Sequence, residues 1–182
     1  MLFPVLFGVS IVVVSFSGPV IGDPTAVIII KSTKVTQNDC GYLGEVTIDP
    51  VQTKKSSQLN MKFPITKELP PTMMISFTLN FNDADVPPVT QNMTLCDAWS
   101  EPTVGKSLIA SGTPKETFPK ACPFLPGPWA LSKWNPPTDL LPPGLPPSSI
   151  TGKTILFTES GKICVTMDYV GELKRDVPAP GR

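Results

Sequence analysis

The chain has 182 residues, and its 15 Lys and Arg balance 15 Asp and Glu, so its formal net charge is zero. A neutral chain without a basic cluster does not suit nucleic acid as a partner. The sequence contains no histidine, which excludes Ser-His-Asp hydrolysis, Cys-His proteolysis and zinc sites that use histidine. Glu101, Glu116 and Asp139 are scattered carboxylates in predicted loops, where solvated surface charge explains them better than catalysis. We therefore expect a protein that is not an enzyme and that needs no cofactor and no metal.

The first 17 residues carry no charged side chain and have an apolar centre. That centre is too short to span a bilayer comfortably and has the length of a signal-peptide core. Val20 and Gly22 form an acceptable cleavage pattern before Asp23. We expect a signal peptide over 1–22 and a secreted or lysosomal protein, although the lack of Lys and Arg at the start leaves a retained membrane anchor as the alternative.

Several stretches alternate apolar and polar residues with the period of two that a half-buried strand requires. They are 46–48, 59–65 and 73–82, while 27–30 is a β-branched run and 154–170 holds two further strands, 154–158 and 163–170. Between these two lies a turn-forming set over 159–162, which predicts a hairpin. The pattern indicates one all-β domain over 23–174, with seven to nine short strands arranged as an immunoglobulin-like sandwich, followed by a disordered tail over 175–182.

Two predicted strands carry long apolar stripes. On the first, Met73, Ile75, Phe77, Leu79 and Phe81 share one face. In the predicted hairpin, Ile163, Val165, Met167 and Tyr169 share one face of the second strand. Wide apolar faces with Met and Phe suit the wall of a cavity and equally an ordinary core. If a cavity exists, we expect its walls to comprise the first stripe on one side and Ile155, Phe157, Val165 and Met167 on the other.

The region between these strands has weaker patterns. Asn92-Met93-Thr94 is an N-glycosylation sequon, which predicts that the Asn92 side chain faces solvent. The segment 99–120 has glycines and prolines with little periodicity. We expect a loop there, with one short helix or strand near 107–110.

A proline-rich segment runs over 122–147, and its apolar side chains include Trp129, Trp134, Leu140 and Leu141. Proline removes a backbone donor and fixes φ, so we expect neither a helix nor a central strand in this segment. It should form a rigid extended edge that caps a sheet core or lines an opening, unless it is a linker. Tryptophan favours the boundary between water and hydrocarbon. Trp129 or Trp134 could therefore insert into a membrane surface together with Leu140 and Leu141. The alternative is a purely structural role, with both tryptophans in the core.

Residues in and after the proline-rich segment resemble a known family. They are Cys122-Pro123-Phe124, Gly127, Trp129, Leu131, Lys133, Asp139-Leu140, Gly152, Ser160-Gly161-Lys162 and Cys164. The run is similar to the ganglioside GM2 activator branch of the MD-2-related lipid-recognition (ML) domains. The similarity covers about 35–173.

The resemblance implies a hollow β-sandwich with an apolar cavity between two antiparallel sheets. The four cysteines behind a signal peptide suggest two disulfides; three pairings exist, and the family order favours Cys40 with Cys164 and Cys96 with Cys122. The resemblance also implies a non-enzymatic protein that carries or presents a glycolipid, phospholipid or sterol, with a membrane surface and a lipid hydrolase or receptor as partners. The alternative is a secreted interaction module with a filled core that acts through its proline-rich edge in extracellular recognition.

Overall fold

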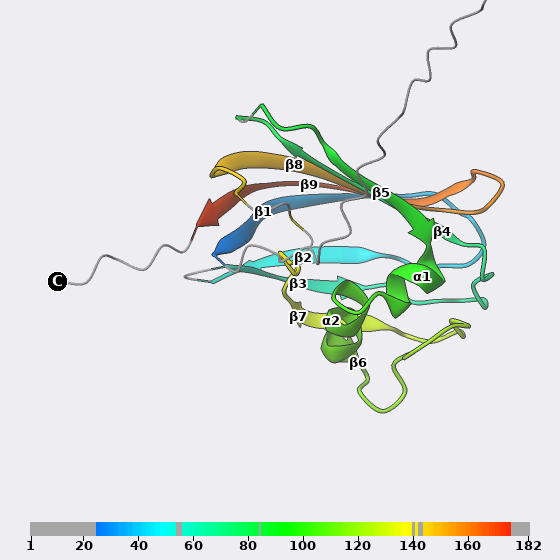
Figure 1. Cartoon of the computed structure of the whole chain (residues 1–182). Coiled ribbons are helices and arrows are strands. Elements are labelled where there is room, and N and C mark those ends of the chain that lie inside the picture. The colour runs from blue at the N-terminus through cyan, green and yellow to red at the C-terminus, as the bar shows by residue number, and fades with distance from the viewer. Residues whose placement is uncertain (1–24, 54–55, 84, 140, 142–143, 176–182) are drawn as a thin grey trace, which may run out of the picture.

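The computed structural model describes residues 25–53, 56–83, 85–139, 141 and 144–175. Within them the chain forms two antiparallel sheets and two short helices, arranged like a β-sandwich. Figure 1 views the two layers nearly edge-on, with the helices in front. The sequence-based expectation of a mainly β, two-sheet fold is thus confirmed. The expected signal peptide over 1–22 and the tail beyond Arg175 lie outside the described residues.

The larger sheet has five strands in the order β1-β9-β8-β4-β5. All neighbours are antiparallel. The predicted hairpin is confirmed as β8 and β9, whose turn is closed by the Gly161 N–H donating to the Thr158 carbonyl at 2.8 Å. The bounds are β1 Ala26–Gln37, β4 Met74–Phe81, β5 Val89–Thr94, β8 Ser148–Phe157 and β9 Ile163–Arg175.

The smaller sheet has four strands in the order β2-β3-β7-β6, namely β2 Thr47–Gln52, β3 Ser57–Lys62, β7 Ala130–Trp134 and β6 Gly112–Thr113. The expectation that the proline-rich segment holds no central strand is wrong, because β7 lies between β3 and β6. Its five residues contain no proline, so every backbone donor remains for the ladder. Near its end Lys133 has a φ of 53°, and the Lys133 N–H donates to Asn60 Oδ1 at 2.9 Å where the register shifts.

Two helices lie in or beside the loop expected over 99–120: α1 Leu95–Ser100 and α2 Val104–Ser111, the second of which contains the short element expected near 107–110. Thr94 caps α1, since its Oγ1 accepts from the Asp97 N–H at 3.0 Å. The Glu101 carboxylate accepts from the backbone N–H groups of Thr103 and Val104 at the start of α2. This carboxylate therefore has a structural role at a helix N-terminus.

The two sheets are joined directly along one side. The Ile30 N–H donates to Ser57 Oγ at 2.6 Å, and Thr33 Oγ1 donates to the Ile48 carbonyl at 2.8 Å, so β1 is tied to β3 and β2. Along the other side, α1 contacts β4 and β5 while α2 contacts β7. The space between the sheets is thus closed by strands on one side and by short helices on the other.

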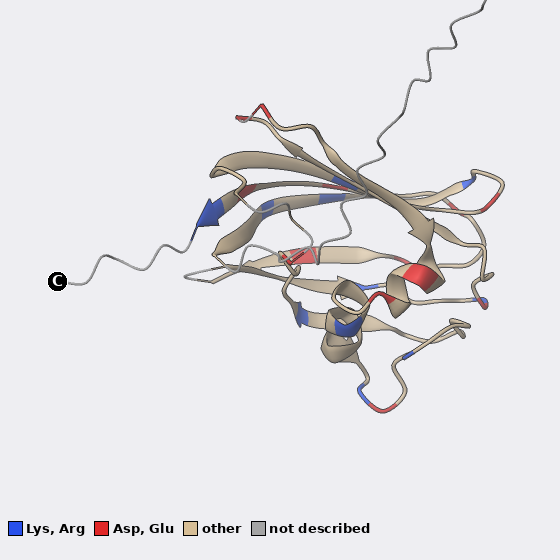
Figure 2. Ribbon diagram, in the orientation of Figure 1, with Lys and Arg blue, Asp and Glu red and all other residues tan. Residues whose placement is uncertain are grey.

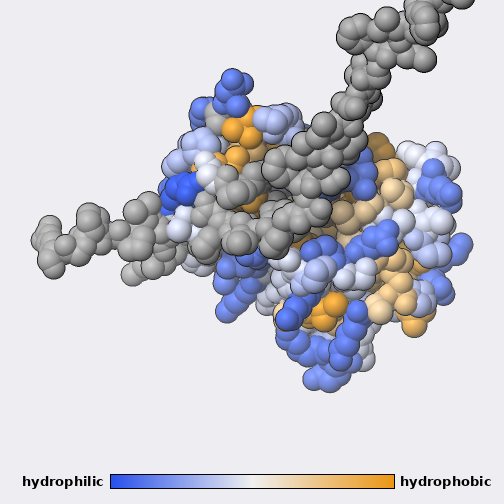
Figure 3. Space-filling view, in the orientation of Figure 1, coloured by the Kyte–Doolittle hydropathy of each residue, from blue (hydrophilic) through white to orange (hydrophobic). Residues whose placement is uncertain are grey.

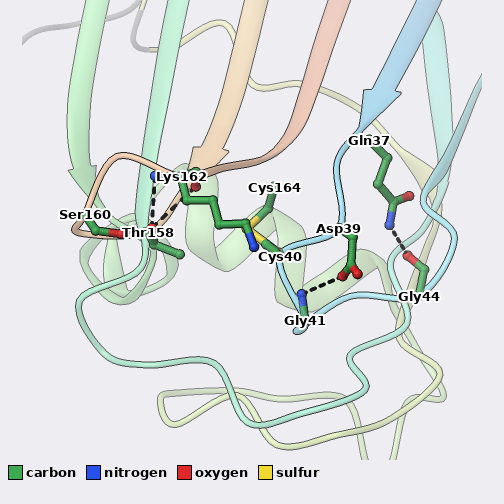
Figure 4. The surroundings of a disulfide bond; sticks show 9 residues. All are labelled: Gln37, Asp39, Cys40, Gly41, Gly44, Thr158, Ser160, Lys162 and Cys164. Carbon is green, nitrogen blue, oxygen red and sulfur yellow. Dashed lines mark hydrogen bonds between the residues drawn. A yellow bond between two sulfur atoms is a disulfide. The ribbon is translucent and has the colours of Figure 1, made fainter.

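Both expected disulfide pairings are confirmed. The Cys40–Cys164 bond joins the residues after β1 to β9, with a Cα–Cα distance of 5.1 Å. The Cys96–Cys122 bond joins α1 to the start of the proline-rich segment, with a Cα–Cα distance of 5.7 Å. Figure 4 shows the first bond beside the β8–β9 turn, with the Gly41 N–H donating to Asp39 Oδ1 nearby. Two disulfides are typical of proteins from an oxidising compartment such as the extracellular space.

Arg175 belongs to the fold rather than to a tail. It ends β9, and its guanidinium donates to the Leu145 carbonyl from Nε at 3.1 Å and from Nη2 at 2.7 Å. A single side chain therefore ties the end of the proline-rich segment to the larger sheet.

Candidate functional site

A cavity of about 330 Å³ lies between the two sheets. Among its lining residues in the described part of the chain, only Gln91, Thr154 and Tyr169 are polar apart from the indoles of Trp99 and Trp134, and none is charged. Pockets of several hundred Å³ with mostly apolar walls and a few polar groups are the usual form of small-ligand sites. Water is a poor occupant here, because a buried water needs several polar partners.

The larger sheet supplies the first wall. On β4, Ile75, Phe77 and Leu79 line the cavity, and on β9 Val165 and Met167 do so. They are five of the nine side chains expected from the apolar stripes. Met73 and Phe81 lie at the two ends of the first stripe and are buried in packed clusters without lining the cavity.

On β8 the expected face is wrong. Thr154 and Leu156 line the cavity, whereas Ile155 and Phe157 do not. Consecutive side chains of a strand point to opposite faces, so a shift of one residue exchanges the whole set. The sequence Thr-Ile-Leu-Phe is apolar at three consecutive positions, and the period of two therefore does not specify its buried face.

The smaller sheet supplies the second wall through Ile48, Leu59, Met61 and Leu131. Their side chains are all apolar, in contrast to the first wall. In the same packed cluster as Leu131, Trp99 of α1 stacks on Phe118 with ring centroids 5.8 Å apart and meets Phe124 edge-on at 4.9 Å. Trp99 also lines the cavity, and its Nε1–H donates to the Pro119 carbonyl at 3.0 Å.

The sequence analysis missed Trp99 as a lining residue and missed helix α1, which holds it at the cavity. The signal was present in Thr94-Leu95-Cys96-Asp97, a Ser/Thr-x-x-Asp/Glu pattern that marks a helix start. α2 adds Val104 and Leu108 to the lining.

The proline-rich segment closes the cavity from one side. Pro136, Pro137 and Leu141 line it, and Leu141 is buried in a cluster with Leu145. Trp134 lines it too and donates from Nε1 to Ser107 Oγ of α2 at 2.9 Å. Leu140 lies outside the described residues.

Trp129 does not lie at a rim. It is 8% exposed and packs edge-on against Phe118, with its Nε1–H donating to the Leu125 carbonyl at 2.9 Å. Of the two candidate rim tryptophans, the structure therefore places Trp129 in the core and leaves only Trp134, which is half-buried, beside the cavity.

Charged residues of both signs are dispersed over the ribbon in Figure 2. Lys153 and Asp168 alternate with the lining residues Thr154 and Met167 along their strands, so they lie on the sheet face that points away from the cavity. Lys153 Nζ lies 3.3 Å from Asp168 Oδ1, and Lys174 Nζ lies 3.0 Å from Glu172 Oε2. Hydrogen bonds from Lys31 and Lys174 lower the pKa of Glu172 below its ordinary value. Such exposed pairs contribute little to stability.

Apolar surface is visible between the two layers on the face shown in Figure 3. On the edge strand beside this space, Gln91 is exposed and lines the cavity, while Asn92 is exposed and points the other way. Asn92 is thus accessible on the outer face of β5, and its glycosylation stays a prediction. No helix in the described part of the chain is long and apolar enough to cross a membrane.

The sequence matches no model of a protein family, and a search of characterised proteins finds no significant similarity.

Proposed function

We propose that this protein is a non-enzymatic lipid-binding protein that holds the apolar part of a lipid between its two sheets and carries or presents it. The observation that supports this is the cavity of about 330 Å³ with an almost wholly apolar lining. An acyl chain or a similar apolar group is the occupant that such a lining favours, because its transfer from water is driven by apolar surface burial.

The energetic cost of an empty cavity also supports a bound lipid. At about 24 cal/mol per Å³ of unfilled volume, a cavity of about 330 Å³ costs roughly 8 kcal/mol. That is of the order of the whole stability of a domain, which is about 5–15 kcal/mol. A bound lipid would fill the space and stabilise the native state by mass action.

We further propose that the chain is a member of the ML domains, in the GM2 activator-like branch, with their immunoglobulin-like topology. The two antiparallel sheets, the cavity between them and the two disulfides are what that resemblance implies, and they support the proposal. The lipid would then be a glycolipid, phospholipid or sterol. A membrane surface, with a lipid hydrolase or receptor, would be the partner in the lumen of the lysosome or outside the cell.

The proposed interaction module with a filled core has less support. Its proline-rich edge would have to present apolar side chains to a partner, but Leu141 and Leu145 are each 6% exposed and Trp129 is 8% exposed. Pro136 and Pro137 line the cavity. Leu125 of this segment is 54% exposed, but these other apolar groups point inward rather than toward a partner.

The decisive experiment is mass spectrometry of an organic extract of the purified protein, together with titration by a fluorescent fatty-acid analogue. We expect a stoichiometric native lipid and saturable probe binding. Ile75→Trp should fill the cavity and abolish probe binding, whereas Ser76→Trp, on the opposite face of β4, should leave it within about twofold. Protein that contains no lipid and binds no probe would contradict the proposal.

A further inference from the structure

Three polar side chains line the cavity: Gln91, Thr154 and Tyr169. All three belong to the larger sheet, on β5, β8 and β9. No side-chain hydrogen bond joins any of them to another residue within the described ranges. The indole N–H groups of Trp99 and Trp134, which also line the cavity, already donate to the Pro119 carbonyl and to Ser107. The larger sheet therefore presents unused hydrogen-bonding groups to the cavity, whereas the smaller sheet presents none.

The register of the sheet brings these groups into neighbouring rows. Gln91 and Thr154 both pair with Phe77, one from each side of β4. Tyr169 pairs with Gly152, two residues from Thr154 on the same face of β8. Residues in such diagonal positions are near enough for a long side chain to reach. The three polar side chains therefore lie in neighbouring positions on the cavity wall, from Gln91 on the exposed edge strand to Tyr169 in the interior of the sheet.

Gly152 fixes where the Tyr169 hydroxyl lies. A Cβ at this position would be 1.9 Å from Cζ and 2.3 Å from the hydroxyl oxygen of Tyr169. The end of the ring therefore lies directly over the backbone of β8, which only glycine permits. Any larger residue would push the hydroxyl away from this wall.

The surroundings of Tyr169 are apolar. Its ring packs against the clusters that contain Ile30, Ile48 and Leu59 on one side and Leu79 and Ile150 on the other. Burial raises the pKa of Tyr169 to about 12, so the hydroxyl stays protonated and available as a donor at neutral and acidic pH. No charged side chain in the described residues lines the cavity, so an uncharged acceptor suits the site better than a charged one, which would be buried without a counter-charge.

We infer that Tyr169, with Thr154 beside it, binds the carbonyl oxygen of an acyl ester or amide, so that the cavity selects acyl lipids over lipids with ether-linked or plain hydrocarbon chains. The inference rests on the proposed lipid-binding function and adds the chemical class of the ligand. The Tyr169 hydroxyl donates to the carbonyl, and Gln91 at the edge strand faces the more polar part of the lipid. An unpaired donor in an apolar site is costly, which makes its acceptor a determinant of specificity.

The test uses two uncharged lipids that differ in one carbonyl group, monopalmitoylglycerol and its ether analogue hexadecylglycerol. Each displaces an apolar fluorescent probe from the purified protein. We expect the wild-type protein to prefer the ester by about three- to tenfold, the effect of one net hydrogen bond. Tyr169→Phe should bring this ratio close to one and leave affinity for the ether within about twofold. Tyr42→Phe, which alters the other tyrosine, away from the cavity, should keep the preference.

Infrared spectroscopy supplies a second measurement. The carbonyl stretching band of the bound ester should shift to lower frequency in the wild-type protein and return toward its unbonded position in Tyr169→Phe. A wild-type protein without preference, or a preference that survives in Tyr169→Phe, would overturn the inference while leaving lipid binding intact. Failure of the probe and both lipids to bind would instead remove the proposed function itself.

Discussion

Burial in the cavity wall changes the acid–base behaviour of Tyr169. Its hydroxyl lies over Gly152 in an apolar part of the cavity wall, and burial raises its pKa from an ordinary value of 10.0 to about 12. The folded protein therefore holds this proton over a pH range in which the unfolded chain has already released it. Stability contributed by the neutral phenol is fully present below pH 10.0 and is lost as the pH rises toward about 12.

A prediction follows for alkaline conditions. A shift of about two pKa units corresponds to a loss of at most roughly 3 kcal/mol in the free energy of unfolding. Urea unfolding between neutral pH and about pH 12 should show this loss in the wild-type protein. Tyr169→Phe should remove that part of the loss, and the late tyrosinate absorbance should disappear with it. An identical pH dependence in both proteins would show that Tyr169 is not held in a buried, neutral form.

At the scale of elements, the corner between α1 and α2 determines one side of the cavity. Gly105, in the first turn of α2, allows the helices to meet so closely that a Cβ there would lie 2.0 Å from the Trp99 carbonyl oxygen and 3.0 Å from that of Ala98. Both atoms are backbone, so no rotamer change relieves the clash. The corner therefore places Trp99, Val104 and Leu108 at the cavity wall only while residue 105 is glycine.

We expect Gly105→Ala to lower the free energy of unfolding by about 2 kcal/mol or more, because overpacking of this kind outweighs the gain of about 1 kcal/mol in helix propensity. Lys106→Ala, at an exposed position of the same helix, should change stability by less than about 0.5 kcal/mol. Urea titrations of both variants provide the comparison. Equal stability in the two variants would mean that the corner is able to open without cost.

Patterns in the sequence predict the strands of this fold better than they predict its helices. The strands at 57–62 and 74–81 follow alternation that each segment shows by itself, and the strand at 47–52 does so in its first residues. The helices are six and eight residues long. Isolated helices of that length are marginal, so tertiary contacts such as the Cys96–Cys122 bond and the packing of Trp99 hold them, and local patterns do not predict these.

The sequence predicts only some of the residues that line the cavity, because a local pattern does not contain the long-range contacts of the fold. Apolar stripes indicate which residues leave water, but the same stripe serves a packed core or a cavity wall. β4 alternates clearly, and its face was predicted correctly through Ile75, Phe77 and Leu79. β8 does not alternate over 155–157, and its face depends on a register that is determined by β4 and β9 together. Long-range pairing of this kind is absent from a local pattern.

For the molecule as a whole, the question is how a small two-sheet domain tolerates space between its sheets. The Cys40–Cys164 bond spans 124 positions and the Cys96–Cys122 bond spans 26. Restriction of the unfolded chain by loops of these lengths contributes roughly 5 and roughly 3.5 kcal/mol in the chain-entropy account. Their sum is close to the cost of roughly 8 kcal/mol for an empty cavity of this size.

Removing each bond by paired Cys→Ser substitution therefore tests how the hollow fold is maintained. We expect the Cys40/Cys164 variant to lose more stability than the Cys96/Cys122 variant, by about 1–2 kcal/mol in urea unfolding of lipid-free protein. The longer bond also anchors the end of β1 next to β9, where the Asn38 N–H donates to the Cys164 carbonyl at 2.8 Å. The reverse order of stabilities would contradict the loop-length argument.

Lipid should then restore part of what the lost bond contributed. A ligand that binds only the native state stabilises it by about 2.7 kcal/mol at a hundred times its dissociation constant. Adding excess lipid to the Cys40/Cys164 variant should raise its free energy of unfolding by an amount that grows with lipid concentration, and Ile75→Trp in the same background should abolish the gain. An equal gain in the presence of Ile75→Trp would show that lipid stabilises the protein from a surface outside the cavity.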